Sequence, residues 1–337
     1  MRRALVTGGC GFIGSNLVRK LVEEGWIVDV VDDMSSGRLD LLSGLTFKTL
    51  PNSSFIAPFN LSDLIKKGRP KKLVLVIQDD FASDYMLDYI KSKAYDVIFH
   101  QAAIPRVSYS VENPGVTTDV NISGTVKLFE AACENVSKLI FASSSSVYGG
   151  ADKLPTSESE PKNPKSPYAW QKSAIEDYAK LCGDLYGLDI ICLRYFNVFG
   201  PGQYGDSPYS TAVSAWCHAI KNGKECRSDG DGEQTRDMCY IDNVVHANIR
   251  AANYFEVVKG QSFNIACSDR VSNNEILSWL KNRYGDKVRV QNAAERPGDV
   301  KHTQADISKA KTQFGYEVQV RFWEGLERTV KWWGLDE

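Results

Sequence analysis

Three glycines at intervals of three residues constrain this chain more than any other feature. Gly8, Gly11 and Gly14 directly follow the apolar run 4–6, and apolar residues at helical spacing come next and end at Gly25. A strand, a glycine-rich turn and a helix in this order let the backbone approach a pyrophosphate, and the free N–H groups of the helix N-terminus favour its negative charge. The turn therefore predicts a dinucleotide site at the start of an α/β domain.

The N-terminal part of the chain alternates short apolar runs with helical patterns. Strands separated by helices form a parallel sheet that is covered on both faces. The fold class that we predict is therefore α/β, a Rossmann-like doubly wound parallel sheet with a smaller C-terminal substrate-binding α/β cap. The expected strands are Arg3–Thr7, Ile27–Val31, Leu73–Ile77, Val97–His100, Leu139–Ser143 and Ile190–Leu193, and the later helices between them are Gly124–Glu134 and Pro167–Tyr186.

The pattern loosens after residue 196, where glycine, proline and aspartate cluster at 200–207 and 228–232. We expect residues 1–196 to form the dinucleotide-binding domain and residues 197–337 to form mainly the cap, with some segments returning to the sheet. The stretch 35–72 is long for a connection between neighbouring strands. We interpret it as a surface insertion.

Composition excludes several classes of protein. The net charge of −2 and the pI near 6.2 provide no basic field for nucleic acid, and no apolar run approaches the roughly 20 residues that span a bilayer. The basic start Met1-Arg2-Arg3 is followed by a short apolar run only, so we expect no signal peptide. The eight cysteines form no Cys-x-x-Cys pair, and the four histidines show no metal-ligand spacing. We therefore expect reduced thiols in a cytoplasmic protein without a metal site.

An acidic pair follows the second predicted strand, in the sequence Val30-Val31-Asp32-Asp33. A carboxylate at the position of Asp32 accepts hydrogen bonds from the adenosine ribose and repels a 2′-phosphate. The cofactor predicted from these residues is therefore NAD rather than NADP. Asp33 either shares this role or is a solvated turn residue.

Tyr168 and Lys172 lie one turn apart in a predicted helix that begins with Ser166-Pro167, a capping serine and a proline at the first helical position. A free phenol ionises near pH 10, and a neighbouring ammonium group favours the phenolate. A Tyr-x-x-x-Lys pattern arises often in amphipathic helices. Together with the glycine turn and the serine run 143–146, however, it predicts oxidation of an alcohol by a nicotinamide.

On these motifs the chain resembles the extended short-chain dehydrogenase/reductase family, and within it the NAD-dependent nucleotide-sugar epimerases, closest to the UDP-N-acetylglucosamine and UDP-glucose 4-epimerases. The resemblance covers nearly the whole chain. It departs at 35–72 and at Asp79-Asp80-Phe81, where the family usually has Gly-Asp before an aliphatic residue. Further matching motifs are His100-Gln101-Ala102-Ala103, Asn121, Ser143–Gly149, Arg194–Gly200, Gly230-Asp231-Gly232, Arg236-Asp237 and Arg296-Pro297-Gly298-Asp299.

The resemblance implies 4-epimerisation of UDP-N-acetylglucosamine and UDP-N-acetylgalactosamine, and also of UDP-glucose and UDP-galactose, through a transient 4-keto sugar with NAD tightly bound. Tyr168 would take the proton of the C4 hydroxyl, Lys172 would hold the nicotinamide ribose and lower the pKa of Tyr168, and Ser144 would bond the C4 oxygen. The implied cofactor residues are Gly8, Gly11, Phe12, Ile13, Gly14, Asp32, Asp33, Asp80, Phe81, Gln101, Ala102, Ala103, Asn121, Ala142, Tyr168, Lys172 and Tyr195. The implied substrate residues are Ser144, Ser145, Ser146, Asn197, Arg236, Arg296 and Thr303.

Substrate choice depends on two positions that the resemblance singles out. Thr303, aligned through the motif that begins at Arg296, lies where family members carry a size gate, and a small residue there admits an N-acetyl group. Uronate epimerases of the family tend to carry an arginine just after the Phe-x-Val-x-Gly segment, and 201–205 contains none. Acetamido sugars are therefore favoured, and UDP-glucuronate 4-epimerisation stays as an alternative.

Other activities of the family need carboxylates that this chain lacks. Sugar-nucleotide 4,6-dehydratases and decarboxylases carry Asp-Glu or Glu directly after the catalytic serine or threonine, where this chain has Ser145 and Ser146. A non-catalytic NAD-binding sensor is a remote alternative, because such proteins commonly lose the tyrosine or the lysine that is present here.

The resemblance also implies a homodimer in which two helices of each copy form a four-helix bundle. These helices are 124–134 and 167–186. The apolar residues expected to provide their contact faces, some of which must face the sheet instead, are Val126, Leu128, Phe129, Ile175 and Tyr178.

Overall fold

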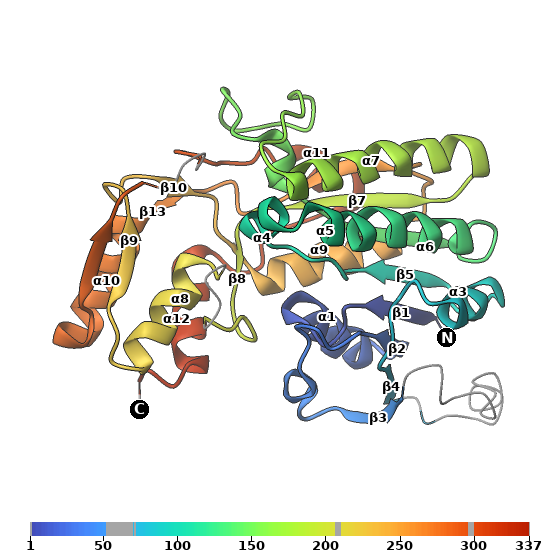
Figure 1. Ribbon diagram of the computed structural model, residues 1–337, viewed down its shortest axis with the longest axis horizontal. Helices are drawn as coiled ribbons and strands as arrows, with labels where there is room; N and C mark the ends of the chain where they lie inside the picture. The colour runs from blue at the N-terminus through green and yellow to red at the C-terminus, as the bar shows by residue number, and fades with distance from the viewer. Residues whose placement is uncertain (1, 52–69, 71, 206–209, 296–299, 337) are drawn as a thin grey trace.

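The computed structural model describes residues 2–51, 70, 72–205, 210–295 and 300–336. At its centre is a parallel sheet of eight strands in the spatial order β12-β7-β6-β5-β1-β2-β4-β3 (Figure 1). From β1 the sheet extends through β2 and β4 to β3 on one side and through β5, β6 and β7 to β12 on the other, as in a doubly wound fold. The bounds are β1 Arg3–Thr7, β2 Ile27–Val31, β3 Thr46–Leu50, β4 Leu73–Ile77, β5 Val97–His100, β6 Lys138–Ser144, β7 Ile190–Tyr195 and β12 Gln261–Ile265.

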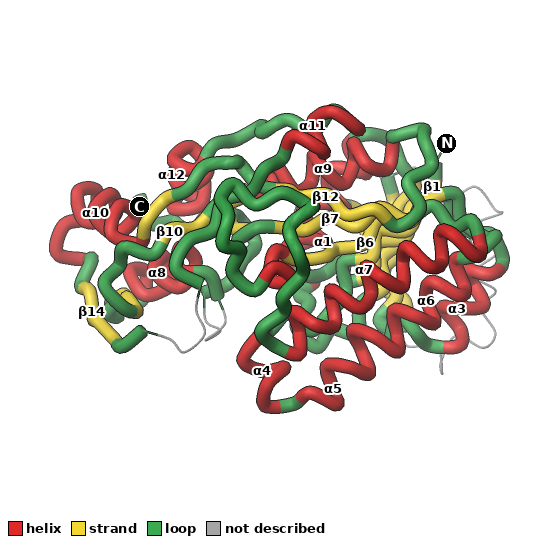
Figure 2. The backbone as a smooth tube through the Cα atoms, turned by 90° about the horizontal axis from the view of Figure 1, so that it is seen from above, coloured by secondary structure: helices red, strands yellow, loops and turns green. Residues whose placement is uncertain are grey.

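Helices cover both faces of this sheet, as Figure 2 shows from above. On one face α1 (Phe12–Glu23) lies against α9 (Ile241–Asn253), and on the other α3 (Asp84–Lys91), α6 (Thr125–Ala132) and α7 (Pro167–Tyr186) lie side by side. Successive strand residues point to opposite faces. In β1, therefore, Ala4 and Val6 join the core under α1 and α9, and Leu5 joins the core under α6 and α7.

The start of α7 follows from its first residues. The hydroxyl of Ser166 accepts a hydrogen bond from the backbone N–H of Ala169, and Pro167 occupies the first turn, as the sequence predicts. The helix ends at Gly187, which has a φ of 69°. The helix α6 (predicted as Gly124–Glu134) ends earlier than predicted, at Ala132, because the backbone of Cys133 is no longer helical, with a ψ of 130°; α4 (Val107–Glu112), α5 (Pro114–Thr118) and a π-helical turn over Asp119–Gly124 precede it.

The range predicted as a surface insertion contributes a strand to the sheet. After a 3₁₀ turn at Leu39–Leu42, β3 pairs in parallel with β4 and forms the edge of the sheet. Only Leu50 of this strand is buried, so its sequence lacks the apolar run or alternation that predicts a strand. Residues 52–69 and 71 of this range lie outside the described residues.

The second half of the chain divides between the sheet and a smaller cap. α9, β12 and α11 (Ser308–Phe314) return to the sheet, whereas Figure 1 places α8, α10 and α12 beyond its end. The cap helices are α8 Ala212–Lys221, α10 Asn273–Tyr284 and α12 Phe322–Trp332. The short strands pair as β9 (Cys226–Asp229) with β14 (Val290–Ala293), β10 (Thr235–Arg236) with β13 (Val271–Ser272), and β8 (Val198–Phe199) with β11 (Cys239–Tyr240).

The structure reassigns the apolar faces of α6 and α7. Leu128, Phe129 and Ile175, expected among the residues of a contact between copies, pack into the core beneath the sheet. Val126 and Tyr178 are only partly buried against that core. The large apolar side chains that α7 exposes are instead Trp170, Leu181, Leu185 and Tyr186.

Candidate active site

A cavity of about 500 Å³ opens at the carboxyl ends of the central strands. The turns after β1, β2, β4 and β5 line it, together with the start of α7 and the segment 202–204. It spans the point between β1 and β5 where the strand order reverses, which is the usual ligand position in such sheets. We call it the cofactor cavity. Its predicted lining residues are Gly8, Gly11, Phe12, Ile13, Gly14, Asp32, Asp33, Asp80, Phe81, Gln101, Ala102, Ala103, Ala142, Tyr168, Lys172 and Tyr195.

The glycine turn leaves no space for side chains. Gly8 has a φ of +67°, and a Cβ on it would lie 2.9 Å from the backbone of Ala102. A Cβ on Gly14 would lie 2.1 Å from the carbonyl oxygen of Gly8. Among the described residues, no side chain caps α1 at Gly11, and its first turn has no acidic residue. The N-terminus of α1 therefore fits a diphosphate, as NAD requires.

Asp32 is held rigidly at the end of β2. Its Oδ2 accepts a hydrogen bond from the backbone of Cys10 at 2.9 Å, and its Oδ1 accepts one from Met34 at 3.0 Å. Burial raises the pKa of this carboxyl group, and the two backbone hydrogen bonds lower it. A Cβ on Gly37 would lie 2.4 Å from Oδ1, so the chain passes close over the carboxylate. This placement fits the ribose contact expected from the sequence.

A cation and an aromatic ring, neither of them predicted from the sequence, close the same end of the cavity. The Arg38 guanidinium carbon lies 4.0 Å from the centroid of the Tyr204 ring, and the Tyr204 hydroxyl donates to Asp40 Oδ2 at 2.9 Å. Arg38 and Tyr204 both line the cavity. The position of Arg38, in the polar loop shortly after Asp32, could have indicated that it lies near the cofactor. No local sequence pattern connects Arg38 with Tyr204.

Tyr168 lies at the other end of the cavity. Burial raises the pKa of its phenol to about 12, and a hydrogen bond with the Ser144 side chain lowers it. Its backbone N–H donates to the hydroxyl of Ser110 at 3.0 Å. The structure thus brings Ser144, at the end of β6, to the phenol on α7, although the two residues are far apart in sequence.

Lys172 is buried one turn further along α7. Its ammonium donates to the carbonyl oxygen of Ala142 at 2.7 Å and lies 5.9 Å from the centroid of the Tyr168 ring. Burial lowers the pKa of Lys172 to about 7, while the nearby Cys192 and Glu176 raise it. In this geometry Ser144 is the group that lowers the pKa of the Tyr168 phenol.

A closed ring of hydrogen bonds supports the cavity beside β7. The Tyr195 hydroxyl donates to Gln101 Oε1 at 3.1 Å, Gln101 Nε2 donates to Asn248 Oδ1 at 3.1 Å, and Asn248 Nδ2 donates back to Tyr195 at 2.8 Å. Asn121 lies behind the cavity wall, although we expected it to contact the cofactor. Its Oδ1 accepts from the backbone of Ile104 at 2.8 Å and thereby fixes a lining residue.

Three of the predicted substrate residues meet in the cap, outside the lining of the cofactor cavity. Asn197 donates to Oγ1 of Thr303 at 3.2 Å, and the same oxygen accepts from the backbone N–H of Asp237 at 3.1 Å. Arg236 follows in β10 and donates to the carbonyl oxygen of Lys301 at 3.1 Å. Arg296, predicted to bind the diphosphate, lies outside the described residues.

The serine run continues from β6 into a 3₁₀ turn over Ser145–Tyr148. Ser144 accepts a hydrogen bond from the backbone N–H of Ser146 at 3.2 Å. The Ser146 hydroxyl is buried without a partner among the described residues. No carboxylate stands at either of the two positions after Ser144, which are Ser145 and Ser146.

Among the described residues, no group of three or more histidine, cysteine, aspartate or glutamate side chains is placed to hold a metal ion. Within the same residues, no helix combines the length and the apolar character needed to cross a bilayer.

This chain is similar in sequence to known proteins. Residues 4–266 match the NAD dependent epimerase/dehydratase family. A UDP-glucose 4-epimerase of Mycolicibacterium smegmatis is 34% identical over 98% of this chain and 97% of its own length. A UDP-glucuronate 4-epimerase of Thermodesulfobacterium geofontis is 32% identical over 97% of this chain and 95% of its own.

Among solved structures, a UDP-N-acetylglucosamine 4-epimerase from Methanobrevibacter ruminantium M1, in complex with UDP-N-acetylmuramic acid, is similar along the whole chain. It is 34% identical, with a TM-score of 0.85 over 100% of this chain and 99% of that one. The predicted resemblance and the α/β fold with its parallel sheet are thereby confirmed, and NAD, the predicted cofactor, is the one on which the matched family depends. This chain belongs to the NAD dependent epimerase/dehydratase family.

Proposed function

We propose that this protein is a UDP-sugar 4-epimerase that interconverts UDP-N-acetylglucosamine and UDP-N-acetylgalactosamine, and also UDP-glucose and UDP-galactose. The observation that carries the proposal is the buried Tyr168 phenol, hydrogen-bonded by Ser144 at the inner end of a cavity that fits a dinucleotide. A tyrosine and a serine at one point suit removal of a proton from a secondary alcohol.

Each residue of the proposed site has its own role in the reaction. Tyr168 takes the proton of the C4 hydroxyl and returns it, and Ser144 holds the C4 oxygen. Bound NAD supplies the acceptor, and afterwards the donor, of the hydride at C4. Lys172, whose ammonium lies 5.9 Å from the centroid of the Tyr168 ring, would hold the nicotinamide ribose of the bound cofactor. Asn197, Arg236 and Arg296 bind the diphosphate region, since arginine matches phosphate oxygens with paired donors.

The preference for acetamido sugars depends on Thr303. This small residue is held by Asn197 and by the backbone of Asp237, so its position relative to the substrate residues is defined. UDP-glucuronate 4-epimerisation is the second candidate, because a relative with that activity is 32% identical to this chain. The segment 201–205 supplies no arginine for a sugar carboxylate.

The test incubates purified protein with UDP-N-acetylglucosamine, UDP-glucose, UDP-glucuronate and dTDP-glucose and separates the products. We expect the C4 epimers of the first two substrates without added NAD. Conversion of UDP-glucuronate alone would support the second candidate. Loss of water or carbon dioxide from any substrate would contradict epimerisation, as would protein that binds these nucleotides and converts none.

We further propose a homodimer in which α6 and α7 of one copy pack on those of the other. Trp170, Leu181 and Leu185 recur along α7 at spacings of eleven and four residues, which places them on one stripe of the helix, and each is exposed in the single chain. Contact with a second copy would remove this apolar surface from water. The eight free cysteine thiols support location in the reducing cytoplasm.

A further inference from the structure

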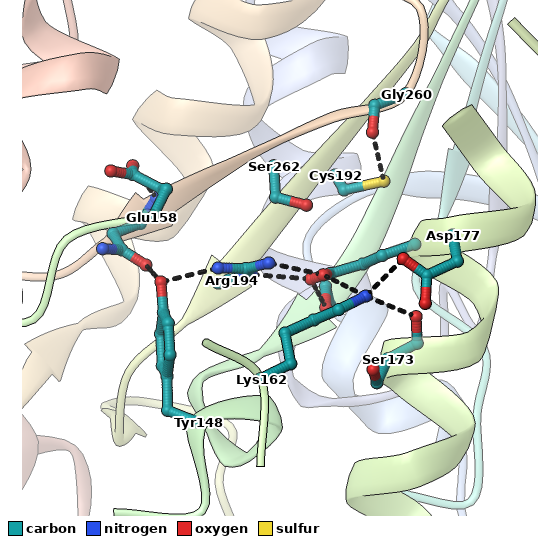
Figure 3. A network of polar contacts seen from close by, with 12 residues as sticks. Tyr148, Glu158, Lys162, Ser173, Asp177, Cys192, Arg194, Gly260 and Ser262 are labelled. Atoms are coloured by element: carbon teal, nitrogen blue, oxygen red, sulfur yellow. Dashed lines mark hydrogen bonds and ion pairs between the residues drawn. The ribbon is translucent and has the colours of Figure 1, made fainter. Parts of the chain in front are cut away.

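A buried carboxylate with a complete set of partners lies beneath the catalytic helix. Glu176, in α7, is 3% exposed. Its Oε1 accepts hydrogen bonds from Ser143 Oγ at 2.6 Å and from Arg194 Nε at 2.8 Å, and its Oε2 accepts one from Arg194 Nη2 at 2.6 Å. Figure 3 shows Arg194 lying between Tyr148, to which it also donates, and Lys162. The Lys162 ammonium is 3.8 Å from Oε2.

These hydrogen bonds join the three elements that carry the proposed chemistry. Glu176 is one helical turn beyond Lys172 in α7. Ser143 directly precedes Ser144 at the end of β6, and Arg194 directly precedes Tyr195 at the end of β7. Each hydrogen-bond partner of the carboxylate is thus the chain neighbour of a residue assigned to the site.

We propose that Glu176 is a positioning residue, which fixes α7 on β6 and β7 so that Tyr168 and Lys172 meet Ser144 and the cofactor cavity. This inference rests on the proposed function, because it assigns to Glu176 a part in the same reaction.

Apolar contacts alone would not specify this alignment so strictly. Ile175 and Ala179 already hold α7 against the sheet, but apolar packing tolerates small displacements. A bidentate pair between arginine and a carboxylate imposes geometry as well as strength. A shift of α7 along β6 would break the bonds of Glu176 to Ser143 and Arg194 and leave buried charge unpaired, which is strongly unfavourable.

The charge of Glu176 also acts on Lys172. Burial lowers the pKa of the lysine, and the Glu176 carboxylate raises it, so that the ammonium persists to higher pH. Removing this negative charge would leave Arg194 without its counter-ion in the same region. The titratable and charged groups around Lys172 are Tyr168 and Glu176 on its own helix, His100 on β5, and Cys192 and Arg194 on β7.

The experiment compares Glu176→Gln, Ser143→Ala and the double variant, each measured as holoenzyme. Glu176→Gln keeps the shape and removes the charge. We expect kcat to fall about 10–100-fold, with KM for the UDP-sugar and bound NAD unchanged. The alkaline limb of the kcat profile should move to lower pH by about half a unit or more, because Lys172 loses its proton sooner. The loss in the double variant should be smaller than the product of the single losses.

Thr329→Val is the matched control. Its buried hydroxyl bonds the Gly325 carbonyl within α12, away from the cavity. If Thr329→Val lowered kcat as much as Ser143→Ala at an equal loss of Tm, the effect would be general instability and the inference would be overturned. A Glu176→Gln variant whose kcat and alkaline limb equal those of the wild type would overturn the inference directly.

A separate measurement distinguishes this inference from the proposed function. Wild-type protein that converts no UDP-sugar contradicts the function. The ionisation of Tyr168 then still reports on how α7 is aligned. It is measured as the change in absorbance at alkaline pH, from the difference between each protein and the same protein carrying Tyr168→Phe. We expect Glu176→Gln to move this ionisation to higher pH, because a displaced α7 weakens the hydrogen bond with Ser144 that lowers the pKa of the phenol. An unchanged ionisation would contradict the positioning role.

Discussion

Asn197 donates a hydrogen bond to the hydroxyl of Thr303 at 3.2 Å, although 106 positions separate them in the chain. Asn197 lies just after β7, where the cap begins, and Thr303 comes from a segment near the C-terminus. Asp237 completes the arrangement, because its backbone N–H donates to the same hydroxyl at 3.1 Å. The residue proposed as a size gate is therefore attached to two neighbours in the proposed substrate region.

Replacing Thr303 with tyrosine should change which sugar the protein accepts. The larger ring would fill the volume of an N-acetyl group, and overfilling a packed site costs on the order of 1–3 kcal/mol. We expect turnover of UDP-N-acetylglucosamine to fall steeply while turnover of UDP-glucose falls much less. Thr303→Ser, which keeps the hydroxyl and the two hydrogen bonds, is the control. Equal losses on both substrates with a normal melting curve would show that Thr303 does not face the sugar.

Removing the phenol oxygen of Tyr168 should abolish most of the activity. Tyr168→Phe keeps the ring packing, and loss of one general base typically lowers the rate about 10²–10⁴-fold. Bound NAD and Tm should stay near their wild-type values. Tyr186→Phe, on an exposed residue at the end of the same helix, serves as the control and should leave the rate unchanged. A wild-type rate in Tyr168→Phe would require another base.

The protein should purify with NAD already bound, and Gly8→Ala should remove it. The added Cβ would lie 2.9 Å from the Ala102 backbone, in the turn that would hold the diphosphate, and the positive φ adds strain. Gly25→Ala is the matched control, because Gly25 also has a positive φ but a Cβ there meets nothing within 4 Å. The amount of nucleotide released by denaturation gives the NAD content of both variants. Equal NAD content in the two would exclude the predicted role of the glycine turn.

Acid should destabilise the fold partly through His100. This buried imidazole lies 2.7 Å from the Thr7 hydroxyl and 3.0 Å from that of Thr125, and burial lowers its pKa from 6.5 to about 3. Between these two pH values the unfolded chain binds a proton that the folded chain does not, so the free energy of unfolding falls as pH falls.

His100→Gln, which cannot be protonated, lacks this contribution. We expect any advantage in Tm of wild type over the variant at neutral pH to shrink steadily as the pH is lowered toward 4. Thermal unfolding of both proteins at a series of pH values measures this difference in Tm. A difference in Tm that stays constant over this range would contradict the neutral, buried state of His100.

A charge in the exposed stripe of α7 should separate the proposed dimer. Leu181 is 48% exposed in the single chain, and Leu181→Glu would place a carboxylate in the proposed contact. Light scattering should give about twice the chain mass of 37.5 kDa for wild type and about that mass for the variant. Phe255→Glu, at an exposed apolar residue after α9, should remain dimeric. A wild-type mass near 37.5 kDa at micromolar concentration would rule out the dimer.

Most of the sheet could be predicted because its strands are short apolar runs bounded by glycines and polar turns. Strand β3 could not, since its edge position leaves Thr46, Lys48 and Thr49 exposed and removes the apolar pattern. The exposed face of α7 was also unpredictable in detail. Ile175 and Trp170 are both large and apolar, and only the packing of α7 on the sheet decides that the first is buried and the second exposed.

The sequence by itself determined the local parts of the site. The glycine turn, Asp32 after its strand, and Tyr168 one turn before Lys172 depend on contacts within a few residues, where spacing dictates geometry. Only the tertiary structure decided which distant residues meet. The stacking of Arg38 on Tyr204, the bond of Asn197 to Thr303, and the anchoring of Glu176 by Ser143 and Arg194 all depend on the order of the strands and on how the cap folds back. No local pattern encodes these arrangements, because the partners lie far apart in the sequence and meet only through the packing of separate elements.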